Sequence, residues 1–410
     1  MSAEPAICTA QCWLSIVGIG EDGVDGLSPV ARRLIGSAEL VVGGARHLEL
    51  AGDLIRGKRL AWPSPMSDAF PEIKRYRGRP VAVLASGDPF HFGVGKQLAA
   101  LFPADEFVCL PQPSAFSLAA ARMGWPLQDV SLVTLHGRAL HGIVRHLQPG
   151  ARILALSWDG ATPGRLAELL HTRGMGQSRM TVLEAMGGSR ERTRHATASD
   201  FDIAEIHPLN TIAIEVIAEP DASIIPLTSG LDDTFFEHDG QLTKQEIRAV
   251  TLSSLRPVQG QLLWDIGLGA GSVAIEWMLQ HPSLRAIGIE ARSDRAERAA
   301  RNAAALGVPD LEIVQGHAPE ALAGLARPDA VFIGGGMMDG VFDATWSALK
   351  PGGRLVANAV SIETEARLAG YFRDFGGDLI RLQIARADKV GTMSGWRPAM
   401  PVTQWRVRKP

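Results

Sequence analysis

The stretch from Leu262 to Trp277, LLWDIGLGAGSVAIEW, carries the residue types best suited to bind a small ligand. Its apolar run predicts a strand buried on both faces, and Gly267, Gly269 and Gly271 predict a tight turn into a helix. Glycines let a ligand approach the backbone, and the first amides of the helix point into the same space. Asp265 precedes the turn at the carboxyl end of the strand, where open α/β sheets bind ligands. An acid there repels a pyrophosphate and attracts an ammonium or sulfonium group.

A second acidic residue ends the next predicted strand. Residues 286–290 read AIGIE, and Glu290 follows the glycines by about 20 residues, the spacing of an acid that binds ribose hydroxyls. Together, DIGLGAG and GIE resemble the cofactor site of the seven-strand S-adenosylmethionine-dependent methyltransferases. A nicotinamide-binding site and a purely structural glycine turn are the alternatives.

Length and composition limit the class of protein. A chain of 410 residues exceeds one ordinary core, so two or three domains are expected. The 46% hydrophobic and 21% charged residues are typical of a soluble globular protein, and no apolar run approaches the roughly 20 residues of a membrane span. The amino-terminal residues lack the features of a secretion signal, so a cytoplasmic location without membrane contact is expected.

Charge and cysteine content bear on the partners. A net charge of -3 disfavours nucleic acid as the main partner. Most basic residues are arginines, whose planar guanidinium binds carboxylates in a bidentate manner. A small substrate with several carboxylates is therefore compatible with the composition. Cys8, Cys12 and Cys109 do not have a metal-binding spacing, so reduced thiols and no metal site are expected.

Residues 13–218 predict strands that alternate with helices, arranged as two small α/β lobes. Strands are expected at residues 13–18, 39–42, 80–84, 131–136, 180–187 and 210–217, with a strand–helix unit at residues 153–170. Glycine-rich turns follow the first and third of these strands, which indicates a cleft. Ser28 is expected to cap a helix that begins at Pro29, and Ser114 or Ser117 to cap a helix rich in small residues.

Five sequence blocks in this half resemble the tetrapyrrole methylase family. They are, in order, VGIGEDG, SGDPFHFG, PSAFSLAAARMGW, LHGR and VLEAMGGSRE. The resemblance implies two α/β lobes around an S-adenosylmethionine cleft. It also implies which residues line the cofactor, namely Gly87, Asp88 and Pro89, with Ser114 and Ala115 behind its methionine part. His136 would lie near the lobe junction. Glu21 stands where many members have proline, so a ligand contact there is not carried over.

Residues 219–230 are expected to form a linker, and residues 231–410 a second domain. Thr243 is expected to cap a helix, with Glu246 completing a capping box. Including the strand that begins at Leu262, seven strands are expected, the last two being residues 378–385 and 402–407, with an antiparallel seventh strand. The predicted fold is therefore α/β throughout, a two-lobed tetrapyrrole methylase fold followed by a seven-stranded Rossmann-like methyltransferase fold.

Residues 230–360 resemble the decarboxylating precorrin methyltransferases of cobalamin biosynthesis. The resemblance is carried by DGQLTKQEIRAVTLSSLRP, LLWDIGLGAGSVAIEW, GIEARSDRAERAARNAAALGV, DAVFIGGG and LKPGGRLVANAV. It implies cofactor contacts at Thr243, Gly267, Leu268, Gly269, Ala270, Gly271, Glu290 and Ala318, to which Asp265 is added from the argument above. Relatives commonly have an acid after Gly316, and this chain has His317.

The two resemblances together imply one bifunctional enzyme. It would methylate a precorrin-6B-like tetrapyrrole at carbons 5 and 15 and remove the ring C acetate carboxyl group, with one S-adenosylmethionine site in each half. The resemblance links the amino-terminal half to carbon 5, and the carboxyl-terminal half to carbon 15 and the decarboxylation. The substrate's carboxylates suggest Arg138, Lys244 and Arg248 as clamps. Trp396, in a loop at residues 388–400, is expected either to cover the macrocycle or to pack in a core. A bifunctional methyltransferase acting on RNA or protein is one alternative, and a non-catalytic scaffold that carries the next intermediate is another. Members of both families self-associate, so a homo-oligomer is expected.

Overall fold

The computed structural model describes residues 12–410, which divide into two compact units. Unit 1 extends to Leu140 and continues from Gln148 to Ser223, whereas unit 2 comprises His141–Leu147 and Ile224–Pro410. The backbone therefore passes between the units inside the predicted linker, and a short segment of the amino-terminal half belongs to unit 2. None of the helices in this part of the chain is long and apolar enough to cross a membrane.

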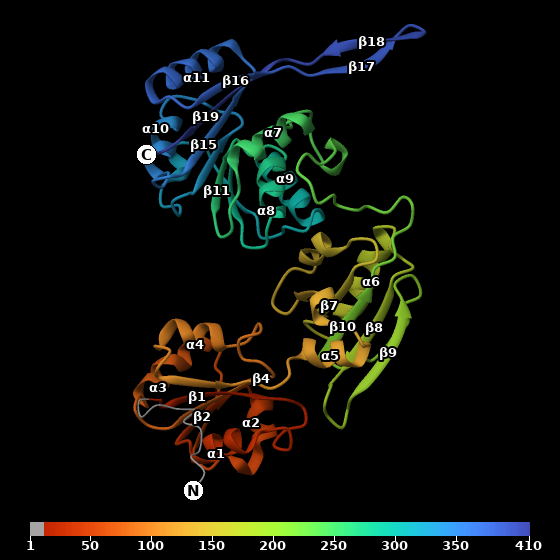
Figure 1. Cartoon of the computed structure of the whole chain (residues 1–410), viewed down its shortest axis with the longest axis vertical. Coiled ribbons are helices and arrows are strands. Elements are labelled where there is room, and N and C mark those ends of the chain that lie inside the picture. Colours follow the sequence, from red (N-terminus) through yellow and green to blue (C-terminus); the bar gives the residue numbers. More distant parts are fainter. Residues whose placement is uncertain (1–11) are drawn as a thin grey trace. The chain divides into compact units, whose positions relative to one another are not determined.

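Unit 1 begins with a five-stranded parallel sheet of order β3-β2-β4-β1-β5 (Figure 1). Every residue of β1 and β2 is buried, as expected for strands covered on both faces. Ser28 caps α1 as predicted, because its hydroxyl accepts a hydrogen bond from the Ala31 amide at 3.2 Å. The elements are β1 (Leu14–Ile19), α1 (Pro29–Ser37), β2 (Leu40–Gly43), α2 (Ala45–Ala51), β3 (Lys58–Ala61), α3 (Phe70–Arg75), β4 (Val81–Ser86), α4 (Gly95–Leu101) and β5 (Phe107–Leu110).

A second five-stranded sheet of order β6-β7-β10-β8-β9 completes unit 1. Only β6 and β7 pair in parallel, and the other neighbours are antiparallel. The buried Glu184 carboxylate on β8 binds Arg192 and Arg194 and so ties β8 to the edge strand β9. The elements are α5 (Ala115–Met123), β6 (Ser131–Thr134), β7 (Arg152–Leu156), α6 (Thr162–Thr172), β8 (Arg179–Glu184), β9 (Arg192–Thr197) and β10 (Asn210–Glu215).

Unit 2 is built on a seven-stranded sheet of order β13-β12-β11-β14-β15-β19-β16. The first five strands of that order are mutually parallel, and β19 runs antiparallel to both of its neighbours. The strands are β11 (Leu262–Ile266), β12 (Arg285–Glu290), β13 (Glu312–Gln315), β14 (Ala330–Ile333), β15 (Arg354–Ala359), β16 (Asp378–Leu382) and β19 (Val402–Arg408). The seven predicted strands and the antiparallel seventh are present.

Helices cover both faces of the unit 2 sheet. One face carries α7, α8 and α9, and the other carries α10 and α11 (Figure 1). Large aromatic side chains fill the second face, where Phe342 stacks on Tyr371 and contacts Trp405. The helices are α7 (Gln245–Leu255), α8 (Ser272–Leu279), α9 (Ser293–Ala305), α10 (Val341–Ala348) and α11 (Ile362–Phe375).

The expected loop at residues 388–400 is a hairpin instead. It consists of β17 (Ala385–Val390) and β18 (Met393–Pro398), which pair only with each other and extend away from the sheet of unit 2 (Figure 1). Three strands of unit 1, β3, β5 and β9, were not predicted. Their residues are exposed or half-buried, so none of them is a buried strand of the kind that the sequence patterns identify.

Candidate cofactor and substrate sites

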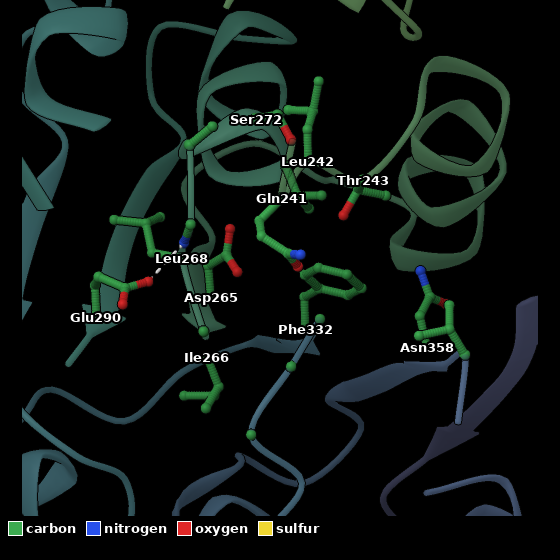
Figure 2. A pocket seen from close by; sticks show the side chains of 18 of the residues that line it. Gln241, Leu242, Thr243, Asp265, Ile266, Leu268, Ser272, Glu290, Phe332 and Asn358 are labelled. Carbon is green, nitrogen blue, oxygen red and sulfur yellow. Dashed lines mark hydrogen bonds between the residues drawn. The ribbon is translucent and has the colours of Figure 1, made fainter. Parts of the chain in front are cut away.

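A cavity of about 630 Å³ opens in unit 2 at the carboxyl ends of the central strands (Figure 2). The ends of β11 and β12 provide its two acids, and the loop after β14 provides Gly334–Gly336. The chain just before α7 closes another side through Gln241, Leu242 and Thr243. The cavity therefore lies at the sheet edge where ligands bind in open parallel sheets.

Asp265 and Glu290 lie on the adjacent strands β11 and β12, and both are buried. Asp265 Oδ2 accepts a hydrogen bond from the Ala274 amide in α8 at 3.1 Å. Glu290 Oε2 accepts one from the Gly269 amide at 2.8 Å, and Oε1 accepts one from the Arg292 amide at 3.1 Å. These bonds fix both carboxyl groups beside the glycine turn.

The electrostatics of Asp265 favour a cationic ligand. Burial raises the pKa of the Asp265 carboxyl to about 8, the Ala274 amide opposes this effect, and the charge of Glu290 adds to it. Among residues 12–410, no Lys, Arg or His forms an ion pair with Asp265. A positive group in the cavity would supply the missing counter-charge and stabilise the ionised carboxylate.

The glycine turn requires glycine for two separate reasons. Gly267, Gly269 and Gly271 all have positive φ, between 57° and 80°, which other residues rarely adopt. A Cβ atom on Gly267 would also lie 2.9 Å from the Gly335 carbonyl oxygen, so the turns after β11 and β14 meet backbone to backbone. The turn therefore presents bare backbone to the cavity at Gly267 and Gly269.

Most residues predicted to bind the cofactor in this half line the cavity. They are Thr243, Asp265, Gly267, Leu268, Gly269, Ala270, Glu290 and Ala318. Gly271 does not line it. Gly271 is instead the N-cap of α8, and a Cβ atom there would meet Ala299 and Ile275 at 3.2 Å. The exposed His317 also lines the cavity.

Other lining residues had no sequence signal of their own. From β14 onward the wall is largely apolar apart from one amide and one guanidinium, and consists, besides the glycine loop, of Phe332, Met338, Asn358, Val360, Ile384, Arg386, Ala399, Met400 and Val402. Arg386 lies on the hairpin and pairs with Glu246. Only their positions near the carboxyl ends of β14 and β15, at the start of β19, or on or next to the hairpin could have indicated them. The cavity thus has an acidic half over β11 and β12 and an apolar half over β14 and β15.

Two predictions around α7 are wrong. The helix begins at Gln245, its N-cap is Lys244, and no side chain caps it, so Thr243 and Glu246 do not form a capping box. Glu246 instead pairs with Arg386 on the hairpin. Since Thr243 lines the cavity and has no capping role, its hydroxyl is open to a ligand.

Arg248 cannot clamp a substrate, because its side chain is completely buried. Its guanidinium binds Glu276 in α8, Asp233, and the carbonyl oxygens of Thr243 and Leu231. Every nitrogen of the guanidinium is used in these contacts. Arg248 therefore ties α7 to α8 and to the preceding loop. Its predicted role as a substrate clamp is wrong, and its role is structural.

The other predicted substrate residues remain accessible. Lys244 lines the cavity, lies 3.5 Å from Asp233 and is about half exposed. His136 and Arg138 are exposed in the loop after β6, where the His136 ring lies 6.4 Å from that of Trp158. Trp396 is 76% exposed on β18, so the alternative that it packs in a core is wrong.

Three loops converge at the carboxyl edge of the first sheet in unit 1. A Cβ atom on Gly18 would lie 1.8 Å from the Gly87 carbonyl oxygen, and one on Gly87 would lie 3.0 Å from Ser114 Cα. Ser114 caps α5 by accepting a hydrogen bond from the Ser117 amide at 3.1 Å. The predicted cofactor segments Gly87–Pro89 and Ser114–Ala115 are therefore neighbours.

A polar cluster that the sequence did not indicate adjoins these loops. Ser86 Oγ lies 2.8 Å from both Arg46 Nη2 and His47 Nε2, and Arg46 also pairs with Glu21. Burial, together with the charge of Arg46, lowers the pKa of His47 to about 4, so its imidazole is neutral near pH 7. Asp88 Oδ1 accepts a hydrogen bond from the Phe90 amide at 2.9 Å and does not cap α4.

Within residues 12–410, no group of three or more His, Cys, Asp and Glu side chains is arranged to hold a metal ion. Cys8 lies outside the described residues. Cys109 lies on β5 in unit 1, whereas the cavity belongs to unit 2.

The chain matches known proteins along nearly its whole length. Residues 14–202 match the tetrapyrrole (corrin/porphyrin) methylases, and residues 234–409 match the precorrin methyltransferase domain. A Sinorhizobium protein named precorrin-6Y C(5,15)-methyltransferase [decarboxylating] is 56% identical over 405 residues, covering 98% of each chain. The Mycobacterium tuberculosis protein of the same name is 40% identical over 398 residues, covering 96% of this chain and 99% of that one.

A shorter relative matches only part of the chain. The Salmonella typhimurium cobalt-precorrin-6B C(15)-methyltransferase (decarboxylating) is 32% identical over 166 residues, which are 39% of this chain and 85% of that protein. The full-length matches, at 56% and 40% identity, decide the family. The chain belongs to the decarboxylating precorrin-6Y C(5,15)-methyltransferases.

Proposed function

We propose that this chain methylates a precorrin-6B-like tetrapyrrole at carbons 5 and 15 and removes the carboxyl group of its ring C acetate as carbon dioxide. The observation that carries the proposal is the pair of buried acids beside a glycine turn, in a chain that matches decarboxylating methyltransferases over 96% of its length or more. The names of these relatives give no support to RNA or protein as the substrate.

The unit 2 cavity fits S-adenosylmethionine. Glu290 would accept hydrogen bonds from the ribose hydroxyls, and Asp265 would face the positive end of the ligand. The backbone around Ala318 would contact the adenine. A sheet of order β13-β12-β11-β14-β15-β19-β16, with glycines at the turn after β11, supports a Rossmann-like methyltransferase fold for unit 2.

The carbon 15 methylation and the decarboxylation are assigned to unit 2, which matches the precorrin methyltransferase domain. A second S-adenosylmethionine site is proposed in unit 1, for methylation at carbon 5. Its two five-stranded sheets support the two-lobed tetrapyrrole methylase fold. Gly87, Asp88 and Pro89 would line the cofactor, with Ser114 and Ala115 behind its methionine part. The backbone contact between Gly87 and Ser114 supports this arrangement, because it holds both segments at one edge of the first sheet.

The two methylations differ in their proton balance. S-adenosylmethionine supplies an activated methyl group on a positively charged sulfur. At carbon 5, a methyl group replaces a hydrogen, so one proton must leave the substrate. At carbon 15, the methylene carbon left by decarboxylation gains the proton that carbon 15 loses, so no net proton is released. A proton acceptor is therefore needed only for carbon 5.

The protein's contribution is mainly positioning and exclusion of water. An activated methyl donor needs no protein nucleophile, and correct alignment can account for much of the rate. Lys244 is proposed to bind a substrate carboxylate at the unit 2 cavity, and His136 and Arg138 are proposed to do so in unit 1. Trp396 is proposed to cover the macrocycle, since its exposed ring lies on the hairpin that extends from the sheet beside the cavity.

The proposed reaction is tested by mass spectrometry of the full chain incubated with precorrin-6B and S-adenosylmethionine. The expected product has gained two methyl groups and lost carbon dioxide, and an unchanged tetrapyrrole would refute the proposal. The full chain is required because His141–Leu147 belongs to unit 2, so a cut near Ala222 would remove part of that unit.

Replacing Trp396 by alanine tests the cover. The expected result is weaker tetrapyrrole binding, by about tenfold, because a large aromatic contact is lost. Fluorescence titration measures the affinity, and an unchanged affinity would show that the hairpin does not contact the macrocycle. The variant should fold normally because the ring is exposed. We also propose that the chain forms a homo-oligomer, as the sequence predicts, and light scattering of the wild-type chain tests this.

A further inference from the structure

Asn358 is the amide side chain within the apolar half of the unit 2 cavity. It lies near the carboxyl end of β15, whereas the two acids end β11 and β12. Figure 2 shows Asn358 across the pocket from Asp265 and Glu290, with the Phe332 ring between them. Its position separates it from the proposed cofactor-binding residues.

A buried hydrogen-bond network fixes the Asn358 carboxamide. Asn358 Nδ2 donates to Thr251 Oγ1 at 3.0 Å, and Asn358 Oδ1 accepts from Gln404 Nε2 at 2.9 Å. Gln404 is itself held by Ser254, whose hydroxyl donates to Gln404 Oε1 at 2.8 Å. Thr251 and Gln404 are completely buried, and they come from α7 and β19. The network determines which end of the amide is oxygen and which is nitrogen.

The network leaves one donor of Asn358 for a ligand. An amide nitrogen carries two N–H groups, and one of them is used by Thr251. Among residues 12–410, no second acceptor lies within hydrogen-bonding distance of Asn358 Nδ2. Asn358 is half-buried and lines the cavity, so the remaining N–H can reach a bound molecule.

The space beside Asn358 suits the substrate better than the cofactor. Adjacent strands lie about 4.8 Å apart, so β15 lies roughly 10 Å from β11 and about 14 Å from β12. The acids on β11 and β12 define the cofactor half, whereas the cavity lining on β14, after β15 and on β19 is apolar at Phe332, Val360 and Val402. The arginine that lines the cavity from the hairpin, Arg386, is paired with Glu246. An apolar surface of this kind suits the face of a tetrapyrrole ring.

We propose that Asn358 is a substrate-orienting residue, which donates a hydrogen bond to the ring C acetate carboxylate that is lost as carbon dioxide. This inference rests on the proposed function of unit 2. Carbon 15 adjoins ring C, so a molecule placed for methylation at carbon 15 brings this acetate into the same half of the cavity. Asn358 holds the carboxylate so that its carbon–carbon bond overlaps the π system of the ring.

A neutral donor suits decarboxylation better than a cation does. The bond between the methylene and carboxyl carbons breaks, its electron pair enters the conjugated ring, and carbon dioxide leaves. Carbon 15 gains the methyl group and gives its proton to the methylene carbon, while the sulfonium donor becomes a neutral thioether. Negative charge leaves the carboxylate during this step, so a lysine or arginine bound to it would stabilise the starting state more than the transition state. A neutral amide orients the carboxylate and stabilises the starting state less than a cation would.

The test uses full-length Asn358→Ala and Asn358→Asp with precorrin-6B and S-adenosylmethionine. Both variants should lose decarboxylation by about tenfold to a hundredfold, because a hydrogen bond and the orientation it provides are lost. The expected product that accumulates carries one methyl group, at carbon 5, and retains the acetate. Asn358→Asp should also weaken tetrapyrrole binding, measured without S-adenosylmethionine, because two carboxylates repel each other.

Two controls separate this role from a structural one. Ser361→Ala removes the cap of α11 three residues away and should leave product composition unchanged. Calorimetry should show unchanged S-adenosylmethionine binding by unit 2 in Asn358→Ala. Decarboxylation by Asn358→Ala at the wild-type rate would overturn the inference, as would loss of cofactor binding together with decarboxylation. If the wild-type chain itself produces no methylated, decarboxylated product, the proposed function fails and not this inference alone.

Discussion

At the scale of single residues, Asp265 links stability to cofactor binding. Burial raises its pKa from 3.8 to about 8, so the folded chain without ligand holds a neutral carboxyl near pH 7. A raised pKa in the folded state contributes stability that is complete below about pH 4 and is lost as the pH rises through about 8. A cationic ligand favours the ionised form, so its binding releases a proton and strengthens as the pH rises.

Asp265→Asn removes this titration. Relative to wild type, the ligand-free variant should become progressively more stable between about pH 5 and pH 8, because the wild type alone loses stability there. Its affinity for S-adenosylmethionine should fall at least about tenfold, because the counter-charge is gone. Thermal unfolding across this pH range and calorimetry measure the two effects. Parallel stability profiles for variant and wild type would contradict the raised pKa.

At the scale of elements, Arg248 holds α7 in place above the cavity. Its guanidinium reaches α8 through Glu276, whose carboxylate also accepts hydrogen bonds from the Gly230 and Leu231 amides. The Arg248 side chain is fully buried and that of Glu276 is 1% exposed. The position of Thr243 at the cavity wall therefore depends on a buried ion pair.

Arg248→Met should destabilise unit 2 by about 3–5 kcal/mol, because Glu276 would be left as an unpaired buried charge. Denaturant unfolding monitored by tryptophan fluorescence measures the loss. Arg373→Met is the matched control: this residue pairs with Asp374 and is 77% exposed, so its change should stay below about 1 kcal/mol. Arg248→Met combined with Glu276→Gln should recover part of the stability, because the buried charge is gone and the amide oxygen can still accept a hydrogen bond from the Gly230 or Leu231 amide. A loss no larger than that of Arg373→Met would refute the structural role.

At the scale of the whole molecule, the two proposed cofactor sites belong to different units and should be separable. The wild-type chain should bind two equivalents of S-adenosylmethionine in calorimetry. Gly269→Val adds a branched side chain at φ 57° and should remove the equivalent in unit 2 only. Its product should carry one methyl group and retain the acetate.

The complementary change is Asp88→Ala, in unit 1. It should remove the other equivalent and leave decarboxylation and one methylation intact, because the unit 2 cavity is unaltered. A wild-type chain that binds a single equivalent at saturation would contradict the two-site proposal. Loss of both equivalents in either variant would show that the sites are coupled.

Local sequence order accounts for what could be predicted. Asp265 and Glu290 each lie at the carboxyl end of an apolar run. The two runs form adjacent parallel strands, so the two acids lie close together. Contacts between distant segments did not follow. Arg248 resembled any exposed arginine on a helix, because Glu276 lies 28 positions away. The orientation of Asn358 could not be predicted, because it depends on Gln404, which lies 46 positions later on β19, antiparallel to β15.

The place of β19 also sets an order of assembly. In the sheet, β16 contacts only β19, yet β16 precedes β19 in the chain by the whole length of the hairpin. During synthesis on the ribosome, β16 emerges with no hydrogen-bonding neighbour and must wait until β19 has inserted beside β15. Gln404 arrives on that same strand, so the orientation of Asn358 is the last feature of this pocket to form. Chaperones that shield an unpaired strand would act during this interval.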